Sequence, residues 1–323
     1  MMPPTPTSEG EILHCSNLKS FSLSELKAAT RNFHRNNLLG EGDFGSVFKG
    51  WIDESSLVAA KPGTGVVIAV KILNQDGLEG HSEWLAEVNY LAQFSHSHLV
   101  RLIGYCLKDK DRLLVYEYMP RGSLENYLGS AHFQPLSWSL RLKIALDAAK
   151  GLAFLHIAET KVVCLDFKAS NVLLDSNYNA KLSVSVLAKD GISYDQTNAN
   201  AAREFRHASR NIAPEFILTG HLTARGNVYS FGVFLLEMLS GKRVFDNYRP
   251  TGQRNLVEWA KPYLANKCEV LQVLDTHLEG QYSVEDAYKL ATLTLQCISE
   301  LPKSRPNMDE VVALLEQLQA PIC

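Results

Sequence analysis

The stretch Gly40-Glu41-Gly42-Asp43-Phe44-Gly45-Ser46-Val47 decides how the rest of this 323-residue chain is interpreted. It has the pattern GxGxxGxV, whose fixed positions are Gly40, Gly42, Gly45 and Val47. Glycines let a turn lie close to phosphate groups because no Cβ intrudes. The same pattern opens dinucleotide-binding folds, but there it leads from a strand into a helix. Here the residues after Gly45 continue as a strand, which favours a phosphate loop between two strands and leaves a plain glycine-rich hairpin as the alternative.

Two charged residues downstream support the phosphate loop. Ile68-Ala69-Val70-Lys71 is an apolar strand that ends in a lysine, and an ammonium in that position reaches the phosphates of ATP. Glu87 lies midway along the helix that we expect at about 82–94, where it can pair with Lys71 and hold it extended. A single Lys or Glu is usually a solvated charge, so the interpretation depends on all three elements in this order.

A second group of motifs lies in the later half of the chain. Asp166-Phe167-Lys168-Ala169-Ser170-Asn171 has an aspartate and, five residues later, an asparagine, as in the loop HRDxxxxN. In that loop the aspartate accepts a proton from a substrate hydroxyl group and the asparagine holds magnesium. Farther on, Ala213-Pro214-Glu215 matches an APE element, and Arg305 is the residue expected to pair with Glu215.

These motifs resemble those of protein kinases, over nearly the whole chain from about Phe33 to Leu318. The chain also resembles the plant receptor-like cytoplasmic kinases of the PBS1-like type, for example in Asn17-Leu18-Lys19-Ser20-Phe21. The resemblance implies an α+β, two-lobed protein-kinase fold, with a small antiparallel β lobe that carries one main helix and a large, mainly α-helical lobe. The implied division is a flexible leader and extension at 1–32, an N-lobe at 33–119, a C-lobe at 120–318 and a tail at 319–323.

The resemblance also implies ATP as the cofactor. Lys71 would then contact the phosphates of ATP beside the glycine loop, and Glu87 would hold Lys71 in place. Tyr116 would be the gatekeeper, and the backbones of Glu117 and Met119 would meet the adenine.

The triplet after Ser183 departs from this family. A working kinase has Asp-Phe-Gly there, whereas this chain has Val184-Ser185-Val186. The missing carboxylate is the main magnesium ligand, and valine offers no donor atom to a hard cation. Losing one preorganised electrostatic group costs about 10²–10³ in rate. Asp166 and Lys168 are therefore expected to be retained but not productive, with Asn171 as the one obvious side-chain ligand left for a metal.

Without the family, the run Val184-Ser185-Val186-Leu187 is apolar at alternate positions, which predicts a strand. Leu165 and Asn227 are two further departures. Leu165 stands in place of an arginine that would bind a phosphorylated activation loop. Asn227 stands in place of an aspartate, and we expect its amide to accept backbone hydrogen bonds without charge, at a loss of roughly 1–2 kcal/mol.

The segment 191–212 lacks the phosphorylation sites and the docking sequence of the family. It has three arginines and one histidine between Arg203 and Arg210. These residues are either a binding surface for an acidic partner or part of a solvated loop whose sequence is no longer constrained by function.

The composition is that of an ordinary soluble globular chain, with 46% apolar and 21% charged residues. The net charge of −3 gives no electrostatic reason to expect nucleic acid as a partner. No apolar run reaches the ~18 residues of a membrane span, and the start has neither a signal peptide nor a myristoylation motif. Six scattered cysteines without a CxxC pair favour reduced thiols. We therefore expect a cytoplasmic location, with any recruitment to the plasma membrane made by partners.

Two functions remain open at this point. The first is a pseudokinase that acts as an adaptor, scaffold or decoy in plant receptor or immune signalling, with receptor kinases, immune receptors or related cytoplasmic kinases as partners. The second is a weakly active ATP-dependent serine/threonine kinase. A decaying gene copy is a third possibility, which the consistent core pattern argues against. It also stays open whether the chain binds ATP together with a metal, binds ATP without a metal, or does not bind ATP. The changed triplet makes magnesium binding doubtful.

Overall fold

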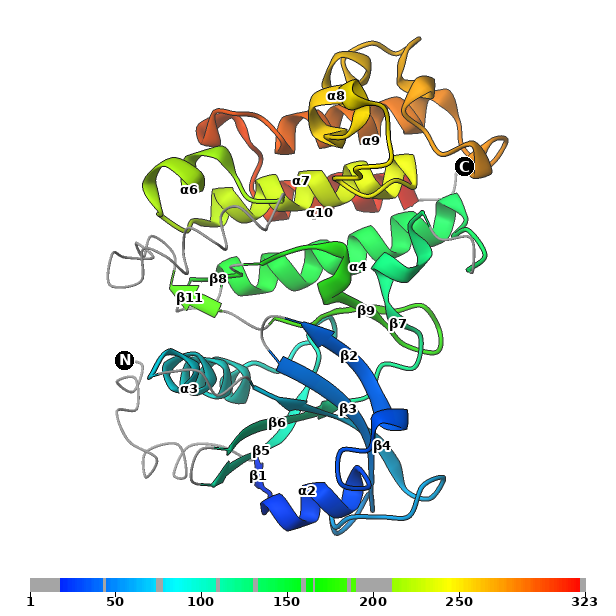
Figure 1. The fold of residues 1–323 in the computed structure, drawn as a ribbon. Helices are drawn as coiled ribbons and strands as arrows, with labels where there is room; N and C mark the ends of the chain where they lie inside the picture. The colour runs from blue at the N-terminus through cyan, green and yellow to red at the C-terminus, as the bar shows by residue number, and fades with distance from the viewer. Residues whose placement is uncertain are drawn as a thin grey trace. The chain divides into compact units, whose positions relative to one another are not determined.

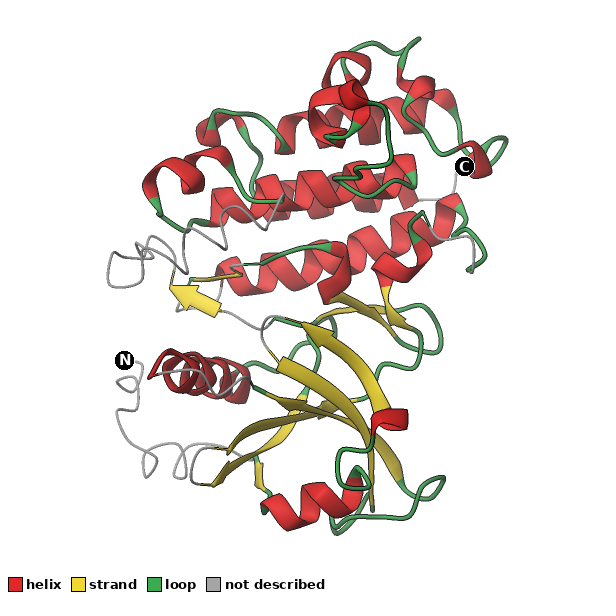
Figure 2. Cartoon of the chain, viewed as in Figure 1, coloured by secondary structure: helices red, strands yellow, loops and turns green. Residues whose placement is uncertain are grey.

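The computed structural model of the chain divides into two compact units, Met1–Met119 and Pro120–Cys323. It describes residues 18–42, 45–73, 78–108, 111–129, 133–157, 161–164, 166–184, 187–189 and 211–319. Most of the described strand residues belong to the first unit and most of the described helices to the second (Figures 1 and 2). This division agrees with the expected α+β protein-kinase fold.

One six-stranded sheet forms the framework of the first unit, with the strand order β1-β5-β6-β4-β3-β2. β1 pairs with β5 in parallel, and the other pairs are antiparallel. The main helix is α3 (Leu78–Gln93), which packs against β5 and β6 through the buried Trp84. The strands are β1 (Lys19–Ser20), β2 (Leu38–Gly42), β3 (Gly45–Ile52), β4 (Val66–Ile72), β5 (Leu102–Lys108) and β6 (Asp111–Glu117).

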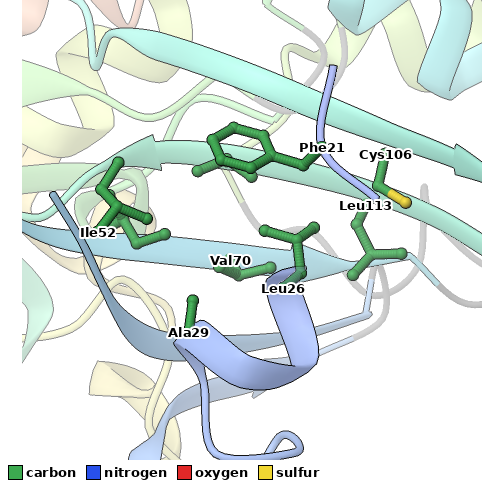
Figure 3. Close-up of a cluster of buried hydrophobic side chains, with 9 residues drawn as sticks. Phe21, Leu26, Ala29, Ile52, Val70, Cys106 and Leu113 are labelled. Carbon is green, nitrogen blue, oxygen red and sulfur yellow. The ribbon is translucent and has the colours of Figure 1, made fainter. Parts of the chain in front are cut away.

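Residues 19–29, within the leader and extension expected at 1–32, contain regular structure that begins with β1 at Lys19–Ser20. The N–H of Phe21 donates to the carbonyl of Tyr105 at 2.8 Å, and the ring is buried. Helix α2 (Leu23–Ala29) follows, and its Leu26 and Ala29 lie with Phe21 on the sheet (Figure 3). Burial of these apolar side chains fixes the segment, and two paired residues are too few to show strand periodicity in the sequence.

Helices pack on helices in the second unit. α7 (Ala224–Ser240) is buried from Gly226 to Ser240 and packs against α4 and α9, while α10 packs against α4 (Figure 1). The apolar pattern at 228–239 predicts a helix that begins at Val228. α7 begins four residues earlier, because the Thr223 side chain caps it by accepting from the N–H of Gly226. The other helices are α4 (Trp138–Ile157), α6 (Pro214–Thr219), α8 (Leu256–Leu264), α9 (Val284–Cys297) and α10 (Met308–Gln319). No described helix is both long and apolar enough to cross a membrane.

Single 3₁₀ turns complete both units, at η1 (Arg35–Asn37), η2 (Leu124–Tyr127), η3 (Ala169–Asn171), η5 (Thr251–Gln253), η6 (Val270–Gln272), η7 (Thr276–Leu278) and η8 (Pro302–Ser304).

Two small sheets in the second unit position the residues around Asp166. β7 (Gly122–Ser123), β9 (Val172–Leu174) and β10 (Ala180–Leu182) form one sheet, and β8 (Val162–Cys164) pairs with β11 (Leu187–Lys189) in the other.

The strand predicted over 184–187 is wrong at its first residue, Val184, which belongs to no strand. β10 ends at Leu182 opposite the start of β9, and β11 begins at Leu187 opposite the end of β8, so Val184 has no strand to pair with. Ser185 and Val186 lie outside the described residues.

Candidate functional site

The glycine motif forms the hairpin between β2 and β3, in which Gly42 faces Gly45. Gly45 is required by the fold, because it has a φ of +122° and a Cβ there would lie 1.9 Å from the carbonyl oxygen of Ile72. A Cβ at Gly40 or Gly42, in contrast, would meet nothing within 4 Å. Packing within this unit therefore does not explain these two glycines, whereas close approach of a ligand to the backbone would.

The glycine hairpin and the lysine strand are in register. Val47 on β3 is half-buried and lies opposite Lys71 on β4. The antiparallel pairing of β3 with β4 thus joins the phosphate-loop motif to the lysine, as the motif order suggested. Asp43 and Phe44, between the glycines, lie outside the described residues.

Lys71 is held by the expected ion pair with Glu87. The Nζ of Lys71 lies 3.2 Å from Oε2 and 3.4 Å from Oε1 of Glu87, and both side chains are buried. The two residues come from β4 and α3, so the pair also joins the helix to the sheet. Such a pair keeps the lysine extended, ready to contact a phosphate group.

Tyr116 is a third group at this ion pair, and its bond to Glu87 is the feature that sequence reasoning missed. From β6, next to β4 in the sheet, its hydroxyl donates a hydrogen bond to Oε1 of Glu87. Burial raises the pKa of Glu87, and the Lys71 ammonium and the Tyr116 hydroxyl oppose that rise. Burial and the nearby Glu87 charge raise the pKa of Tyr116 well above its usual value, so the hydroxyl keeps its proton and acts as a donor. Tyr116 therefore orients Glu87. Its role as the gatekeeper stays a prediction.

The two residues predicted to meet adenine follow at the end of the first unit. The N–H of Glu117 donates to the carbonyl of Arg101 at 3.0 Å, and its side chain accepts from the N–H of Arg101 at 2.8 Å. Met119 is buried. The role of their backbones toward adenine stays a prediction.

In the second unit, the loop after β8 brings three predicted residues together. The Nζ of Lys168 lies 2.5 Å from Oδ2 of Asp166, which is buried. The amide nitrogen of Asn171 donates to the carbonyl of Asp166 at 2.7 Å, and the carbonyl of Asn171 accepts from the N–H of Ser183 at 2.8 Å. These bonds tie the loop to the segment that carries the changed triplet.

Val184 lies beside the aspartate and the asparagine of this loop. It lines a small hollow of about 10 Å³ together with Asp166 and Asn171. Of the described residues around this hollow, Asp166 is the only one with a charge, and Lys168 already pairs with it. Magnesium demands an octahedral set of oxygen ligands and is held through carboxylates. The valine supplies none, so this donor set does not fit a magnesium ion.

Asn227 supports the catalytic loop more fully than expected. Its Oδ1 accepts from the N–H of Cys164 at 2.8 Å, and its Nδ2 donates to the carbonyl of Cys164 at 2.6 Å. A carboxylate cannot make the second bond, which offsets part of the loss expected from the missing charge. Burial and the Asp166 charge raise the pKa of the Cys164 thiol, which keeps it protonated. Leu165 lies outside the described residues.

The predicted pair between Glu215 and Arg305 is confirmed. The guanidinium of Arg305 donates to both carboxylate oxygens of Glu215, at 2.6 and 2.7 Å. Its Nε donates to the carbonyl of Ser299, and it lies 5.0 Å from the ring centre of Tyr229. The APE element is thereby fixed to the segment after α9. Of the altered segment 191–212, only Asn211 and Ile212 are described.

Comparison with known proteins identifies the family. Residues 33–315 match the family described as protein tyrosine and serine/threonine kinase. The chain belongs to the protein kinase family. This kinase homologue is 63% identical over 319 residues to the probable serine/threonine-protein kinase PBL9 of Arabidopsis thaliana, which covers 98% of this chain and 77% of the relative.

Two further relatives indicate which group of protein kinases the chain belongs to. The kinase homologue is 62% identical over 320 residues to receptor-like cytoplasmic kinase 176 of Oryza sativa subsp. japonica, covering 98% of this chain and 80% of the relative. It is 56% identical over 318 residues to serine/threonine-protein kinase BIK1 of Arabidopsis thaliana, covering 97% and 79%. The chain is thus one of the receptor-like cytoplasmic kinases, as its motifs indicated.

Membership of this family implies ATP binding, usually with magnesium. ATP would bring a transferable γ-phosphoryl group, and Lys71, held by Glu87, is the residue in the first unit whose charge fits a phosphate. The two units therefore differ in what their residues could bind. In the first unit, Lys71 fits a nucleotide phosphate; in the second, the residues around Val184 do not fit a magnesium ion.

Proposed function

We propose that this kinase homologue is a pseudokinase, which acts through protein contacts as an adaptor, scaffold or decoy in plant receptor or immune signalling. One observation carries the proposal: Val184 lies beside Asp166 and Asn171, where the metal-binding carboxylate of a kinase would be. Magnesium neutralises the charge that develops on the transferred phosphoryl group, so losing its ligand acts directly on the chemical step.

A weakly active serine/threonine kinase is the second candidate. The ion pair between Lys71 and Glu87 favours it, and so does the contact between Lys168 and Asp166. These are the groups that position phosphates and the substrate hydroxyl in a working kinase. They also suit a protein that binds nucleotide without transferring phosphate, so they do not separate the two candidates.

Transfer of radiolabelled phosphate from ATP separates them. The full chain is incubated with magnesium and, separately, with manganese, beside the variant Asp166→Asn. We expect both proteins to show the same background, because the metal-binding carboxylate is missing. Robust transfer by the natural chain that disappears in Asp166→Asn would overturn the proposal and establish the second candidate.

Thermal unfolding with ATP tests the state of the nucleotide site. We expect ATP to raise the melting temperature equally with and without magnesium, because Lys71 is present and the metal ligand is not. A shift only with magnesium would favour the residual kinase, and the absence of any shift would restrict the proposal to a pure interaction module.

Reversion of the triplet provides the matched control. Val184→Asp combined with Ser185→Phe and Val186→Gly should make the ATP-induced shift depend on magnesium. Full activity is not expected, because Leu165 and the segment 191–212 remain altered. A fully active revertant would show that these other departures matter less than we infer.

The partners we propose are receptor kinases, immune receptors or related cytoplasmic kinases, met in the cytoplasm or at the plasma membrane. Family membership supports this, since the relatives include proteins named as receptor-like cytoplasmic kinases. Proximity labelling in plant cells with the full chain tests it. Labelling that is no richer in kinases and receptors than that of an unrelated cytoplasmic protein would contradict it.

A further inference from the structure

A groove in the second unit lies apart from Asp166 and its neighbours. It has a volume of about 390 Å³ and is lined by residues of α6, α7 and α8 and by Glu300, which follows α9. We call it the α6–α8 groove. Pro214 and Leu218 of α6 and Val257 of α8 supply apolar lining, and Glu258 and Lys261 of α8 supply charge.

Large apolar side chains at and beside this groove are exposed. Leu218, in its lining, is 83% exposed; Ile217, the residue before it, is 48% exposed; and Leu301, next to the lining residue Glu300, is 68% exposed. Single exposed leucines are common on protein surfaces. Leu218, in contrast, is an exposed leucine in the lining of a hollow, and burying it on a partner would remove apolar area from water.

The charges of the groove leave one carboxylate in excess. Glu215 is neutralised by the buried Arg305, and Glu300 pairs with Lys261 at 3.1 Å. Glu258 is exposed and forms no ion pair with any residue that the structure describes. A cation on a partner is therefore the group that would complete this surface.

The floor of the groove is rigidly built. Tyr229 is buried beneath it, with the Arg305 guanidinium 5.0 Å from the centre of its ring. Arg305 is held in turn by both oxygens of Glu215. α8 is fixed at its start by Asn255, whose side chain accepts from the N–H groups of Val257 and Glu258. A preformed surface loses little conformational freedom when a partner binds.

We propose that the α6–α8 groove docks a protein segment that presents an arginine or lysine next to a large apolar side chain. The apolar side chain packs against Leu218, and the cation pairs with Glu258. This docking is independent of phosphate transfer, since the groove and the hollow at Asp166 and Asn171 are lined by different residues. It adds a specific surface to a protein that acts through contacts.

Fluorescence anisotropy with the full chain tests the proposal. The probe is a labelled eight-residue peptide that alternates arginine and leucine, and the control peptides replace either every arginine by glutamate or every leucine by serine. We expect saturable binding of the first peptide alone. Leu218→Ser should weaken it about tenfold, because a buried leucine contact is lost. Glu258→Lys should weaken it about fivefold or more, because an attraction becomes a repulsion.

Glu279→Lys is the matched control, because it makes the same charge change at an exposed glutamate outside the groove. It should alter the affinity less than about twofold. The natural chain and the three variants should unfold at the same temperature, because substitutions of exposed residues usually change stability little. Equal binding of the serine peptide, or equal weakening by Glu279→Lys and Glu258→Lys, would overturn the proposal in favour of unspecific charge attraction. Self-association that Leu218→Ser abolishes, without peptide binding, would overturn it in favour of a second copy of the chain.

Discussion

Glu237 makes the stability of the second unit depend on pH. It lies near the end of α7, where it is buried. Its Oε1 accepts from the N–H of Val244 at 2.7 Å, whereas its Oε2 has no hydrogen-bond partner in the described protein. Burial raises the pKa of this carboxyl from 4.5 to about 7, and the repulsion of Glu125 adds to the rise. The perturbation we choose is Glu237→Gln, which keeps the shape and an acceptor but cannot ionise.

The sign of the effect follows from the two pKa values. Between 4.5 and about 7 the folded state binds more protons at Glu237 than the unfolded state does. Stability is therefore greatest below this window and falls as the pH rises through it. From about pH 5 to about pH 8 the natural chain should lose about 2.5 kcal/mol of unfolding free energy relative to Glu237→Gln.

Urea unfolding at the two pH values measures this difference, and comparison of the two proteins removes the contribution of every other titrating group. Glu279→Gln is the control, because it alters an exposed carboxylate of the same unit. An unchanged difference between the natural chain and Glu237→Gln would refute the reasoning. It would show that Glu237 is ionised in the folded protein and balanced by Arg249, whose buried Nε and Nη1 have no hydrogen-bond partner among the described residues.

Three further changes test packing and hydrogen bonds elsewhere. Gly104→Ala places a methyl group 2.1 Å from the backbone of β1, so the segment before Phe33 should detach and become sensitive to trypsin, which limited proteolysis would show. Asn227→Ala leaves the N–H and the carbonyl of Cys164 buried without their side-chain partner and should lower the unfolding free energy by about 2–4 kcal/mol in urea. Tyr116→Phe removes a hydroxyl that donates to a buried carboxylate and should cost about 1.5–3 kcal/mol in the same assay.

For each of these three variants, one result would contradict the expected effect. Gly252→Ala is the control for Gly104→Ala, because a Cβ at Gly252 meets nothing within 4 Å; equal resistance of both variants to trypsin would show that β1 yields without detaching. A loss below about 1 kcal/mol for Asn227→Ala would mean that water replaces both bonds. An unchanged stability of Tyr116→Phe would mean that Lys71 alone satisfies Glu87.

The sequence was informative wherever a motif is short and its spacing is set by local geometry. The glycine hairpin, the lysine strand and the loop from Asp166 to Asn171 are each contained within a few residues, and these motifs carried the resemblance that implied the family and the fold. Apolar periodicity predicts helices at 256–264 and 284–297, and α8 and α9 have these bounds because their buried residues recur with the helical repeat.

It was less informative where a residue acts through a distant partner. The hydrogen bond from Tyr116 to Glu87 joins residues 29 positions apart, and the two bonds of Asn227 reach back 63 positions to Cys164. Nothing in the neighbouring residues marks such contacts, because they depend on how strands and helices pack. The order of Lys19–Ser20 is of the same kind, since it arises from pairing with β5.

The glycine motif and the changed triplet show which properties follow from the sequence and which from the tertiary structure. The sequence by itself determined that the chain carries the loop, lysine and catalytic-loop pattern of a kinase, and that a valine stands at the magnesium position, because these are properties of residue type and order. Only the tertiary structure decided that Gly45 is needed by the fold, whereas a Cβ at Gly40 or Gly42 would meet no described atom within 4 Å. It alone also decided that Val184 lines one hollow with Asp166 and Asn171. Distances between atoms that are far apart in the chain are set by packing, and packing is a property of the whole folded unit.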